Sequence, residues 1–436
     1  MKHLHTAALQ EDARLAEEEP PGAGASMVKE EEDEPPSTKL ALDHQPIFSH
    51  VPAENWNDWK WHLRNRIVTV EGLAGYIPLS VKEQRHLKMV ISKYPMSITP
   101  YYLSLVDMHD PEDPVRKQAV PAIEEVALAG IGFDDPLAEE GCSVVPGLVH
   151  RYPDRVLMVL TDLCPTLCRH CTRKREWHHG GWVRNPGEIE AMLDYIRRNK
   201  NVRDVIISGG DPLILSTRRL EQVISGLRRI DHVEIIRIGS RFPVVLPQRI
   251  DDELCDMLSD YGPIWLNTHF NHVNEITPES ASACDRLVRS GVPVNNQSVL
   301  LRGVNDSVKA QTDLCHGLLK IKVRPYYLYQ CDEVRGTEHL RTPVETGIKI
   351  IEGMRGHTSG LSVPTFVIDL PQGGGKVPLQ PDYVLAQTEE KLILRNYEGR
   401  LFRYRNPSGP RTRGNAHNGR KRAAAKQKAA PFTVGS

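Results

Sequence analysis

The chain has 436 residues, of which 40% are hydrophobic, and at roughly 150 residues per domain this suffices for one large domain or for two to three smaller ones. Its 55 Lys and Arg residues balance 56 Asp and Glu residues to a formal charge of −1, which disfavours binding to nucleic acid along the whole chain. Apolar runs end after about half a dozen residues, whereas a membrane-spanning helix needs about 20, and the N-terminus lacks the apolar core of a signal peptide. We therefore expect a cytoplasmic protein that does not enter a membrane.

Composition predicts that the two ends of the chain are disordered. Residues 1–45 carry the acidic run Glu30-Glu-Glu-Asp-Glu34 and bury too little apolar surface to become ordered. Residues 407–436 are rich in Gly, Asn, Lys and Arg and have no hydrophobic periodicity, so we expect a solvated basic tail, with an arm that binds a partner as the alternative. After the acidic tail, apolar residues recur every three to four positions at 81–92, which predicts a helical region over residues 46–150.

From residue 151 to residue 376 the pattern predicts alternating strands and helices. Short β-branched runs predict strands at 156–161, 204–208, 233–238, 264–268, 292–298, 323–327 and 365–369, and the amphipathic stretches between them include 187–198, 218–229, 278–290 and 344–355. Their regular spacing favours an α/β fold with a closed or partial (β/α) barrel over an open doubly wound sheet, followed by a short C-terminal extension at 377–406. In such barrels the catalytic residues lie at the C-terminal ends of the strands.

Three of the eight cysteines lie close together after the first predicted barrel strand, in Cys164-Pro-Thr-Leu-Cys168-Arg-His-Cys171. Three thiolates in such a C-x3-C-x2-C segment can bind three irons of a [4Fe–4S] cluster and leave the fourth iron open to a ligand. The alternative is a zinc site with a distant fourth ligand, but structural zinc prefers paired C-x2–4-C units. The spacing therefore favours an iron–sulfur cluster.

Two glycine-rich segments come after other predicted strands. Ile207-Ser-Gly-Gly-Asp-Pro212 ends the second strand, where glycines would let the backbone approach a ligand closely; an ordinary turn is the alternative. Phe366-Val-Ile-Asp-Leu-Pro-Gln-Gly-Gly-Gly-Lys376 ends the last strand. A lysine in such a glycine-rich loop can form a Schiff base with a carbonyl cofactor, and a flexible surface loop is the alternative.

Together these segments resemble the lysine 2,3-aminomutase family of the radical S-adenosylmethionine superfamily. The resemblance runs from about residue 47 to residue 398 and includes Asn55-Trp-Asn-Asp-Trp-Lys-Trp61, Leu266-Asn-Thr-His-Phe-Asn-His272 and Arg324-Pro-Tyr-Tyr327. It implies a [4Fe–4S] cluster, S-adenosyl-L-methionine and pyridoxal 5′-phosphate. It also implies an isomerase in which a 5′-deoxyadenosyl radical takes a hydrogen from C3 of lysine, held as an aldimine, and the amino group migrates to C3 to give L-β-lysine.

The resemblance also assigns cofactor-binding residues by position. Cys164, Cys168 and Cys171 would bind the cluster, and Lys376 would hold pyridoxal phosphate. The remaining matches are Arg151 and Arg155 for the phosphate of that cofactor, Gly209, Gly210 and Asp211 for the methionyl amino group of S-adenosylmethionine, and His269 and Gln297 for the lining of the cofactor cavity.

Three further residues match the family positions that bind the substrate. Arg173 would bind the α-carboxylate, and Asp332 and Asp369 would together bind the distal ammonium group. A carboxylate pair rejects a substrate that lacks a distal positive charge, which argues against glutamate. Outside the family context, a surface arginine and two helix-cap or turn aspartates would be the simpler interpretation.

The sequence departs from the family at two places. The family's lysine enzymes carry a cysteine at the position of Ser307 and a cysteine trio near the C-terminus that together bind zinc between subunits, but no cysteine occurs after Cys331 here. We therefore expect a homo-oligomer without zinc between its subunits. Gln372 replaces a glycine that is common in the loop before Lys376, a change that could reshape the cofactor pocket.

The expected function is thus the interconversion of L-lysine and L-β-lysine, with free lysine as substrate and a reducing donor such as flavodoxin or ferredoxin as partner. Alternative substrates are arginine, ornithine or a lysine on a protein. The protein-modifying relatives are shorter and lack the Tyr329-Gln-Cys-Asp332 segment. A non-enzymatic iron–sulfur electron carrier is disfavoured because Arg173, Asp332, Asp369 and Lys376 would have no use in it.

Overall fold

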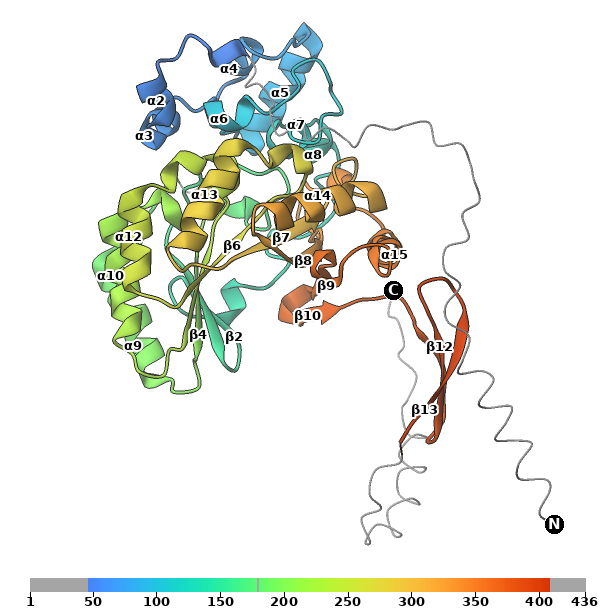
Figure 1. The fold of residues 1–436 in the computed structure, drawn as a ribbon. Coiled ribbons are helices and arrows are strands. Elements are labelled where there is room, and N and C mark those ends of the chain that lie inside the picture. The colour runs from blue at the N-terminus through green and yellow to red at the C-terminus, as the bar shows by residue number, and fades with distance from the viewer. Residues whose placement is uncertain (1–45, 179, 408–436) are drawn as a thin grey trace, which may run out of the picture. The chain divides into compact units, whose positions relative to one another are not determined.

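The computed structural model describes residues 46–178 and 180–407 (Figure 1). The acidic tail predicted at 1–45 lies outside the described residues, as does the basic tail predicted at 407–436 except for its first residue. Within the described part of the chain, every helix is too short or too polar to cross a membrane.

The region before the sheet is built of short helices. The helix predicted at 81–92 is α5 (Val81–Lys93), which begins at a capping box between Ser80 and Glu83 and buries Leu87 and Val90. The other elements here are η1 (Pro46–Phe48), α2 (Ala53–Asn57), α3 (Trp59–Arg64), α4 (Val70–Ala74), α6 (Pro100–Leu103), α7 (Arg116–Ala119), α8 (Glu124–Ala127) and η2 (Glu140–Cys142).

A ten-stranded sheet forms the centre of the fold, with its strands in the order of the sequence. The strands are β1 (Ser143–Val145), β2 (Leu148–Tyr152), β3 (Arg155–Val159), β4 (Asp204–Ser208), β5 (Ile235–Gly239), β6 (Ile264–Thr268), β7 (Val294–Leu300), β8 (Arg324–Gln330), β9 (Thr365–Leu370) and β10 (Gly375–Pro378). Neighbours from β3 to β9 pair in parallel, whereas β1, β2 and β10 pair antiparallel. The sheet is not closed, so the partial barrel is confirmed and the closed one is wrong.

Helices come after the parallel strands and cover the outer side of the sheet (Figure 1). They are α9 (Pro186–Arg198), α10 (Thr217–Arg228), α11 (Phe242–Val245), α12 (Asp252–Asp260), α13 (Pro278–Arg289), α14 (Val308–Lys320) and α15 (Val344–Met354). The 3-10 turns are η3 (Lys174–His178), η4 (Pro212–Ile214), η5 (Pro247–Arg249), η6 (Val273–Glu275), η7 (Glu338–Leu340), η8 (Gly360–Ser362) and η9 (Pro371–Gly373). The four helices predicted in this region are each found within one residue at either end.

The structure corrects the sequence analysis at the edges of the sheet. The region expected to be helical up to residue 150 ends in β1 and most of β2, and the segment around Lys376 expected to be a loop is strand β10. These edge strands are short and carry Ser, His, Arg, Gly and Lys, so they show no alternating hydrophobic pattern. They form instead by pairing with neighbouring strands, β1 with β2, β2 with β3, and β10 with β9.

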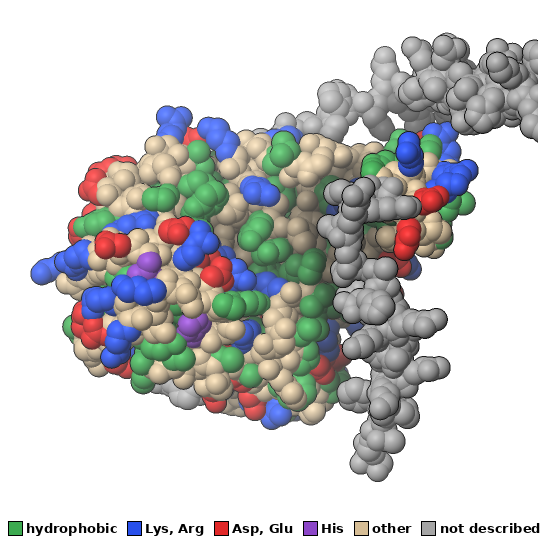
Figure 2. Space-filling view, turned by 90° about the horizontal axis from the view of Figure 1, so that it is seen from below, with side chains coloured by type: hydrophobic (Ala, Val, Ile, Leu, Met, Phe, Trp, Pro, Cys, Tyr) green, Lys and Arg blue, Asp and Glu red, His purple; other side chains and the backbone are tan. Residues whose placement is uncertain are grey.

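The C-terminal extension expected at 377–406 contains a second, three-stranded antiparallel sheet. Its strands are β11 (Val384–Gln387), β12 (Lys391–Arg395) and β13 (Leu401–Arg405). Apolar side chains of this sheet are exposed, including Leu401 at 62%. On the face of the molecule seen in Figure 2, Lys and Arg side chains are mixed with Asp, Glu and hydrophobic ones, so neither sign of charge dominates that face.

Candidate active site

A cavity of about 690 Å³ lies at the C-terminal ends of the parallel strands. Every residue that the sequence analysis assigned to a site lines this cavity, except Gly209. Cys164, Cys168 and Cys171 come from the loop after β3, and Lys376 comes from β10 at the far edge of the sheet. The cysteines, Arg173 and Asp332 come after the C-terminal ends of their strands, whereas Arg151 and Arg155 lie where β2 ends and β3 begins, so the cavity extends along the strands toward their opposite end.

Buried charges fix the cysteine loop to the helical region. Arg169, between two of the cysteines, donates to both carboxylate oxygens of Glu125 on α8, at 2.9 and 2.6 Å, and Lys174 donates to the same carboxylate at 2.7 Å. All three side chains are nearly inaccessible to solvent. Because removal of one partner would leave a buried charge without compensation, this triad holds the loop in one conformation.

The three cysteine thiols fit an iron–sulfur cluster. All are free, and burial together with the neighbouring Cys168 raises the pKa of the Cys171 thiol to about 11, so a bound cation is needed to ionise it. Among the described residues no three His, Cys, Asp or Glu side chains are arranged around one point as a single metal ion requires. A cubane differs from a single ion because each thiolate binds an iron of its own.

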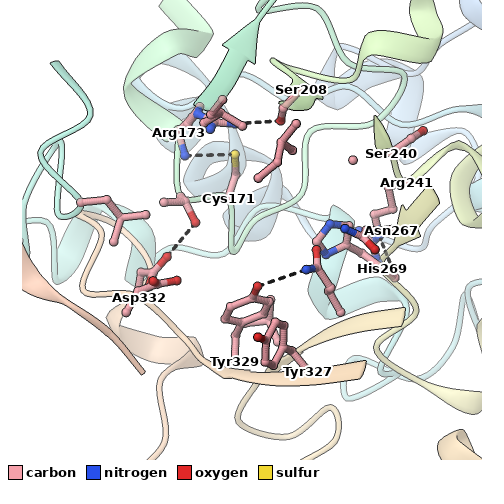
Figure 3. Close-up of a pocket in the computed structure, with 18 of the residues that line it drawn as sticks. Cys171, Arg173, Ser208, Ser240, Arg241, Asn267, His269, Tyr327, Tyr329 and Asp332 are labelled. Carbon is pink, nitrogen blue, oxygen red and sulfur yellow. Dashed lines mark hydrogen bonds between the residues drawn. The ribbon is translucent and has the colours of Figure 1, made fainter. Parts of the chain in front are cut away.

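Arg241 is a residue near the cluster site that the sequence analysis did not identify. It comes shortly after β5 and lies beside His269 in the cavity (Figure 3). Its Nη1 lies 2.8 Å from the Sγ of Cys168, and its Nη2 donates to Glu275 at 2.7 Å. The rule that site residues lie just past barrel strands could have found it, because Ser240 and Arg241 come directly after that strand.

The glycine turn after β4 packs against the cysteine loop. A Cβ on Gly209 would overlap the carbonyl oxygen of Thr161, and a Cβ on Gly210 would overlap that of Leu163. Gly209 also has φ of 149°, which a residue with a side chain rarely adopts. The sequence analysis attributed these glycines to the approach of a ligand, but the structure shows that backbone packing alone already requires them.

Asp211, next to this turn, is a buried structural acceptor. Its carboxylate accepts from the backbone N–H groups of Arg241 at 2.7 Å and Leu213 at 3.1 Å. Burial raises its pKa to about 7. Asp211 thus joins the turn after β4 to the segment after β5.

The cations that match the cofactor phosphate lie on β2 and β3 beside the cavity. Arg151 is on β2 and donates to the carbonyl of Leu137. Arg155 begins β3 and lies over the ring of Tyr152, 4.2 Å from its centroid. Two guanidinium groups on one wall of the cavity suit the phosphate of pyridoxal phosphate.

Lys376 lies opposite Asp369 in the antiparallel pairing of β9 and β10. Its Nζ is 2.9 Å from each carboxylate oxygen of Asp369 and 5.2 Å from the ring centroid of Tyr329. Its backbone N–H donates to the hydroxyl of Tyr152 at 2.9 Å. An amine fixed in this way at the cavity wall suits a Schiff base with pyridoxal phosphate.

The two departures from the family pattern have structural consequences. Gln372 adopts the left-handed conformation, with φ of 56°, and its N–H donates to the carbonyl of Pro136 at 3.0 Å. The turn therefore keeps a backbone conformation that suits glycine, at the cost of some strain. Ser307 caps α14 by accepting from the N–H of Ala310 at 3.1 Å.

Asp332 comes just after β8 and lies in the cavity wall. It accepts from the hydroxyl of Thr172 at 2.8 Å, next to Arg173 in the sequence (Figure 3). Burial, together with the charge of Asp369, raises its pKa to about 6. Asp332 and Asp369 both line the cavity.

His269 and Gln297 line the cavity between these groups. His269 comes directly after β6, and burial together with the charge of Arg241 lowers its pKa to about 4. Gln297 lies within β7, at an irregularity in the pairing with β8, rather than at the strand end as expected. Its Nε2 donates to the hydroxyl of Tyr329 at 3.2 Å, which holds the amide against the cavity wall.

Arg173 is held by a carboxylate that the sequence analysis did not identify. Its Nε and Nη2 donate to the two carboxylate oxygens of Glu139, at 2.9 and 2.7 Å, and its Nη1 donates to the carbonyl of Gly209 at 3.0 Å. Burial opposes ionisation of Glu139, but the charges and donors of Arg173 and Arg175 outweigh it and lower the pKa to about 2. Glu139 precedes the sheet and carries no motif that could have pointed to it.

Comparisons with known proteins identify related sequences. A family profile described as Lysine-2,3-aminomutase matches residues 351–435, and one described as Radical SAM superfamily matches residues 158–312. The L-lysine 2,3-aminomutases of Acetoanaerobium sticklandii and Clostridium subterminale are each 56% identical over 83% of this chain and 87% of their own length. That of Fusobacterium nucleatum is 52% identical over 83% of this chain and 85% of its own.

More distant relatives are also found. A glutamate 2,3-aminomutase of Clostridioides difficile is 42% identical over 80% of this chain and 83% of its own length. Among solved structures, Streptococcus suis SuiB bound to S-adenosylmethionine has a TM-score of 0.38 at 13% identity and covers 50% of this chain and 51% of its own. The family brings with it a [4Fe–4S] cluster, S-adenosylmethionine and pyridoxal phosphate, for which the cysteine loop, the two arginines on β2 and β3 and Lys376 are suited. The high identity over most of both chains, on a partial barrel with these residues in one cavity, shows that the chain belongs to the lysine 2,3-aminomutase family of radical S-adenosylmethionine isomerases.

Proposed function

We propose that this chain interconverts L-lysine and L-β-lysine. The observation that supports this most is that one cavity is lined by a guanidinium group and by two carboxylates, from Arg173, Asp332 and Asp369, with the amine of Lys376 beside them. Free lysine carries one carboxylate and one distal ammonium group, which are the charges that these side chains complement. A substrate held at both ends presents its C2 and C3 atoms between them.

Each side chain has a distinct part in binding. Arg173 binds the α-carboxylate, Asp332 and Asp369 bind the distal ammonium group, and the amine of Lys376 would hold the aldehyde cofactor. When bound, the cluster with S-adenosylmethionine supplies the radical that removes a hydrogen atom, and pyridoxal phosphate supplies the π-system on which the amino group migrates. The partly enclosed cavity keeps the reacting atoms in place and limits the access of water.

The acid pair also decides between the substrates of known relatives. Glutamate would place a second carboxylate next to Asp332 and Asp369, and two or three negative charges in a desolvated pocket repel one another strongly. Arginine and ornithine share the distal positive charge but differ from lysine in length. Lysine is favoured because the relatives that are 52–56% identical to this chain carry its name.

The test is anaerobic reconstitution with iron, sulfide, pyridoxal phosphate and S-adenosylmethionine, and then separate incubation with lysine, arginine, ornithine and glutamate. Products are identified by chromatography and mass. We expect L-β-lysine from lysine and no product from glutamate. Turnover of arginine or ornithine at least tenfold faster than that of lysine would overturn the substrate assignment but not the chemistry, and cofactor-loaded protein without turnover of any amino acid would favour an electron carrier.

We also propose the setting in which the chain works. Its eight cysteines are all free, as suits a reducing compartment such as the cytoplasm. A reducing carrier such as flavodoxin or ferredoxin would supply the electron for the cluster. The exposed apolar side chains of β11 to β13 are consistent with a homo-oligomer, which light scattering of the loaded protein would test.

A further inference from the structure

Glu139 contacts only one edge of the guanidinium group of Arg173, the residue proposed to bind the substrate α-carboxylate. A guanidinium group has five N–H donors: one on Nε and two on each Nη. Glu139 takes the side formed by Nε and Nη2, at 2.9 and 2.7 Å. Among the described residues, Nη2 has no acceptor besides Glu139. Its second N–H is therefore available on the edge of the guanidinium group formed by Nη1 and Nη2, which we call the end of the fork.

The other end of the fork is held more loosely. Nη1 of Arg173 donates to the carbonyl of Gly209 at 3.0 Å, and its contact with the hydroxyl of Ser208 is 3.4 Å long. The longer contact is the weakest of the set and is the one that a carboxylate oxygen would replace. The pair Nη1 and Nη2 thus offers two parallel N–H groups to an incoming carboxylate, which is the arrangement for forked binding.

A second arginine, Arg175, also donates to the carboxylate of Glu139. Arg175 donates from Nη2 to the Oε2 of Glu139 at 3.1 Å, and its side chain is only 13% exposed. Glu139 therefore lies between two guanidinium groups, which keep its carboxylate ionised and hold it in place beside Arg173.

From these contacts we propose that Glu139 is a positioning residue for the substrate carboxylate: it fixes Arg173 along the Nε–Nη2 side so that the Nη1–Nη2 end faces the cavity. This inference rests on the proposed role of Arg173 in binding the α-carboxylate. Glu139 does not touch the reacting atoms. Its effect is on the affinity for the carboxylate, and so on the preference for amino acids over simple amines.

The test compares two ligands that differ only in the carboxylate, lysine and 1,5-diaminopentane. Each is titrated into full-length protein loaded with cluster and pyridoxal phosphate, without S-adenosylmethionine, and binding is monitored by the change in cofactor absorbance. We expect Glu139→Gln to weaken the binding of lysine at least tenfold and that of 1,5-diaminopentane less than twofold. Glu139→Asp, which keeps the charge, should fall between wild type and Glu139→Gln, and it serves as the test if Glu139→Gln does not fold.

Glu140→Gln is the matched control, because Glu140 is the next residue, lies 3.5 Å from Arg175 and is 78% exposed. It should change both affinities less than twofold. Unchanged or tighter lysine binding in Glu139→Gln would overturn the proposal, and so would equal weakening of both ligands, which indicates a general structural role. Arg173→Lys distinguishes failure of the proposed function from failure of this inference. If Arg173→Lys does not weaken the binding of lysine more than that of 1,5-diaminopentane, the proposed role of Arg173 is wrong. If Arg173→Lys does so and Glu139→Gln does not, only the proposed role of Glu139 is wrong.

Discussion

Replacing Asp332 by Asn removes one negative charge from the proposed ammonium site and leaves its shape nearly unchanged. The asparagine amide can still accept from Thr172, which donates to this position at 2.8 Å. A carboxylate about 4 Å from an ammonium group contributes about 4 kcal/mol at an effective dielectric constant of 20. Since Asp369 remains to compensate part of the charge, we expect a loss of about 2–4 kcal/mol, or roughly 30- to 1,000-fold in kcat/KM for lysine.

The assay is steady-state turnover of lysine under anaerobic conditions, with iron content and cofactor absorbance measured on the same preparation. Both of these should match the wild type, because Asp332 lies outside the cysteine loop and the hydrogen bonds of Lys376 Nζ go to Asp369. Asp256→Asn, on the exposed side of α12, is the matched control and should keep full activity. A kcat/KM for Asp332→Asn within threefold of the wild type would refute the assignment of this residue to the ammonium site.

The same cavity leads to three more predictions, on pH, on the cofactor lysine and on the glycine turn. Because the pKa of Asp332 is raised to about 6, its carboxyl group becomes protonated as the pH falls through that value, so kcat/KM for lysine should fall below about pH 6, and Asp332→Asn should lack this decline. Lys376→Ala should lose the cofactor absorbance and the label that borohydride places on a Schiff base, and a label on any other lysine would contradict the assignment. Gly210→Ala should destabilise the protein by roughly 1–3 kcal/mol and lower its iron content, because a Cβ there overlaps the carbonyl of Leu163. The control is Gly130→Ala, where a Cβ meets nothing within 4 Å, and the measurement is the thermal melting temperature of both variants. Equal melting temperatures would contradict this prediction.

The parallel part of the sheet could be predicted from sequence because its signal is local. Strands β4 (Asp204–Ser208) and β6 (Ile264–Thr268) have the predicted bounds, since runs of β-branched and large apolar residues are bordered by polar ones. The cysteine spacing is local as well and predicted the position of its loop. Topology places the residues after each parallel strand at one edge of the sheet, so most of the site residues could be assigned to one cavity.

The rest of the site depends on contacts between distant residues. Glu139 meets Arg173 across 34 positions, and Arg241 meets Cys168 across 73. Neither Glu139 nor Arg241 lies in a motif, and a single carboxylate or arginine on a loop is most often a solvated residue. Strand β10 was not predicted for a related reason: Gly375 and Lys376 have no intrinsic preference for a strand, and it is the pairing with β9 that forms one.

The pairing of β9 with β10 links the cofactor site to the substrate site. Lys376 compensates the charge of Asp369 through two contacts of 2.9 Å, and a carboxylate can accept from a second cation as well, as Glu125 does from Arg169 and Lys174. The antiparallel register that places these two residues opposite each other therefore joins the lysine proposed to hold the cofactor to a carboxylate proposed to bind the substrate ammonium group.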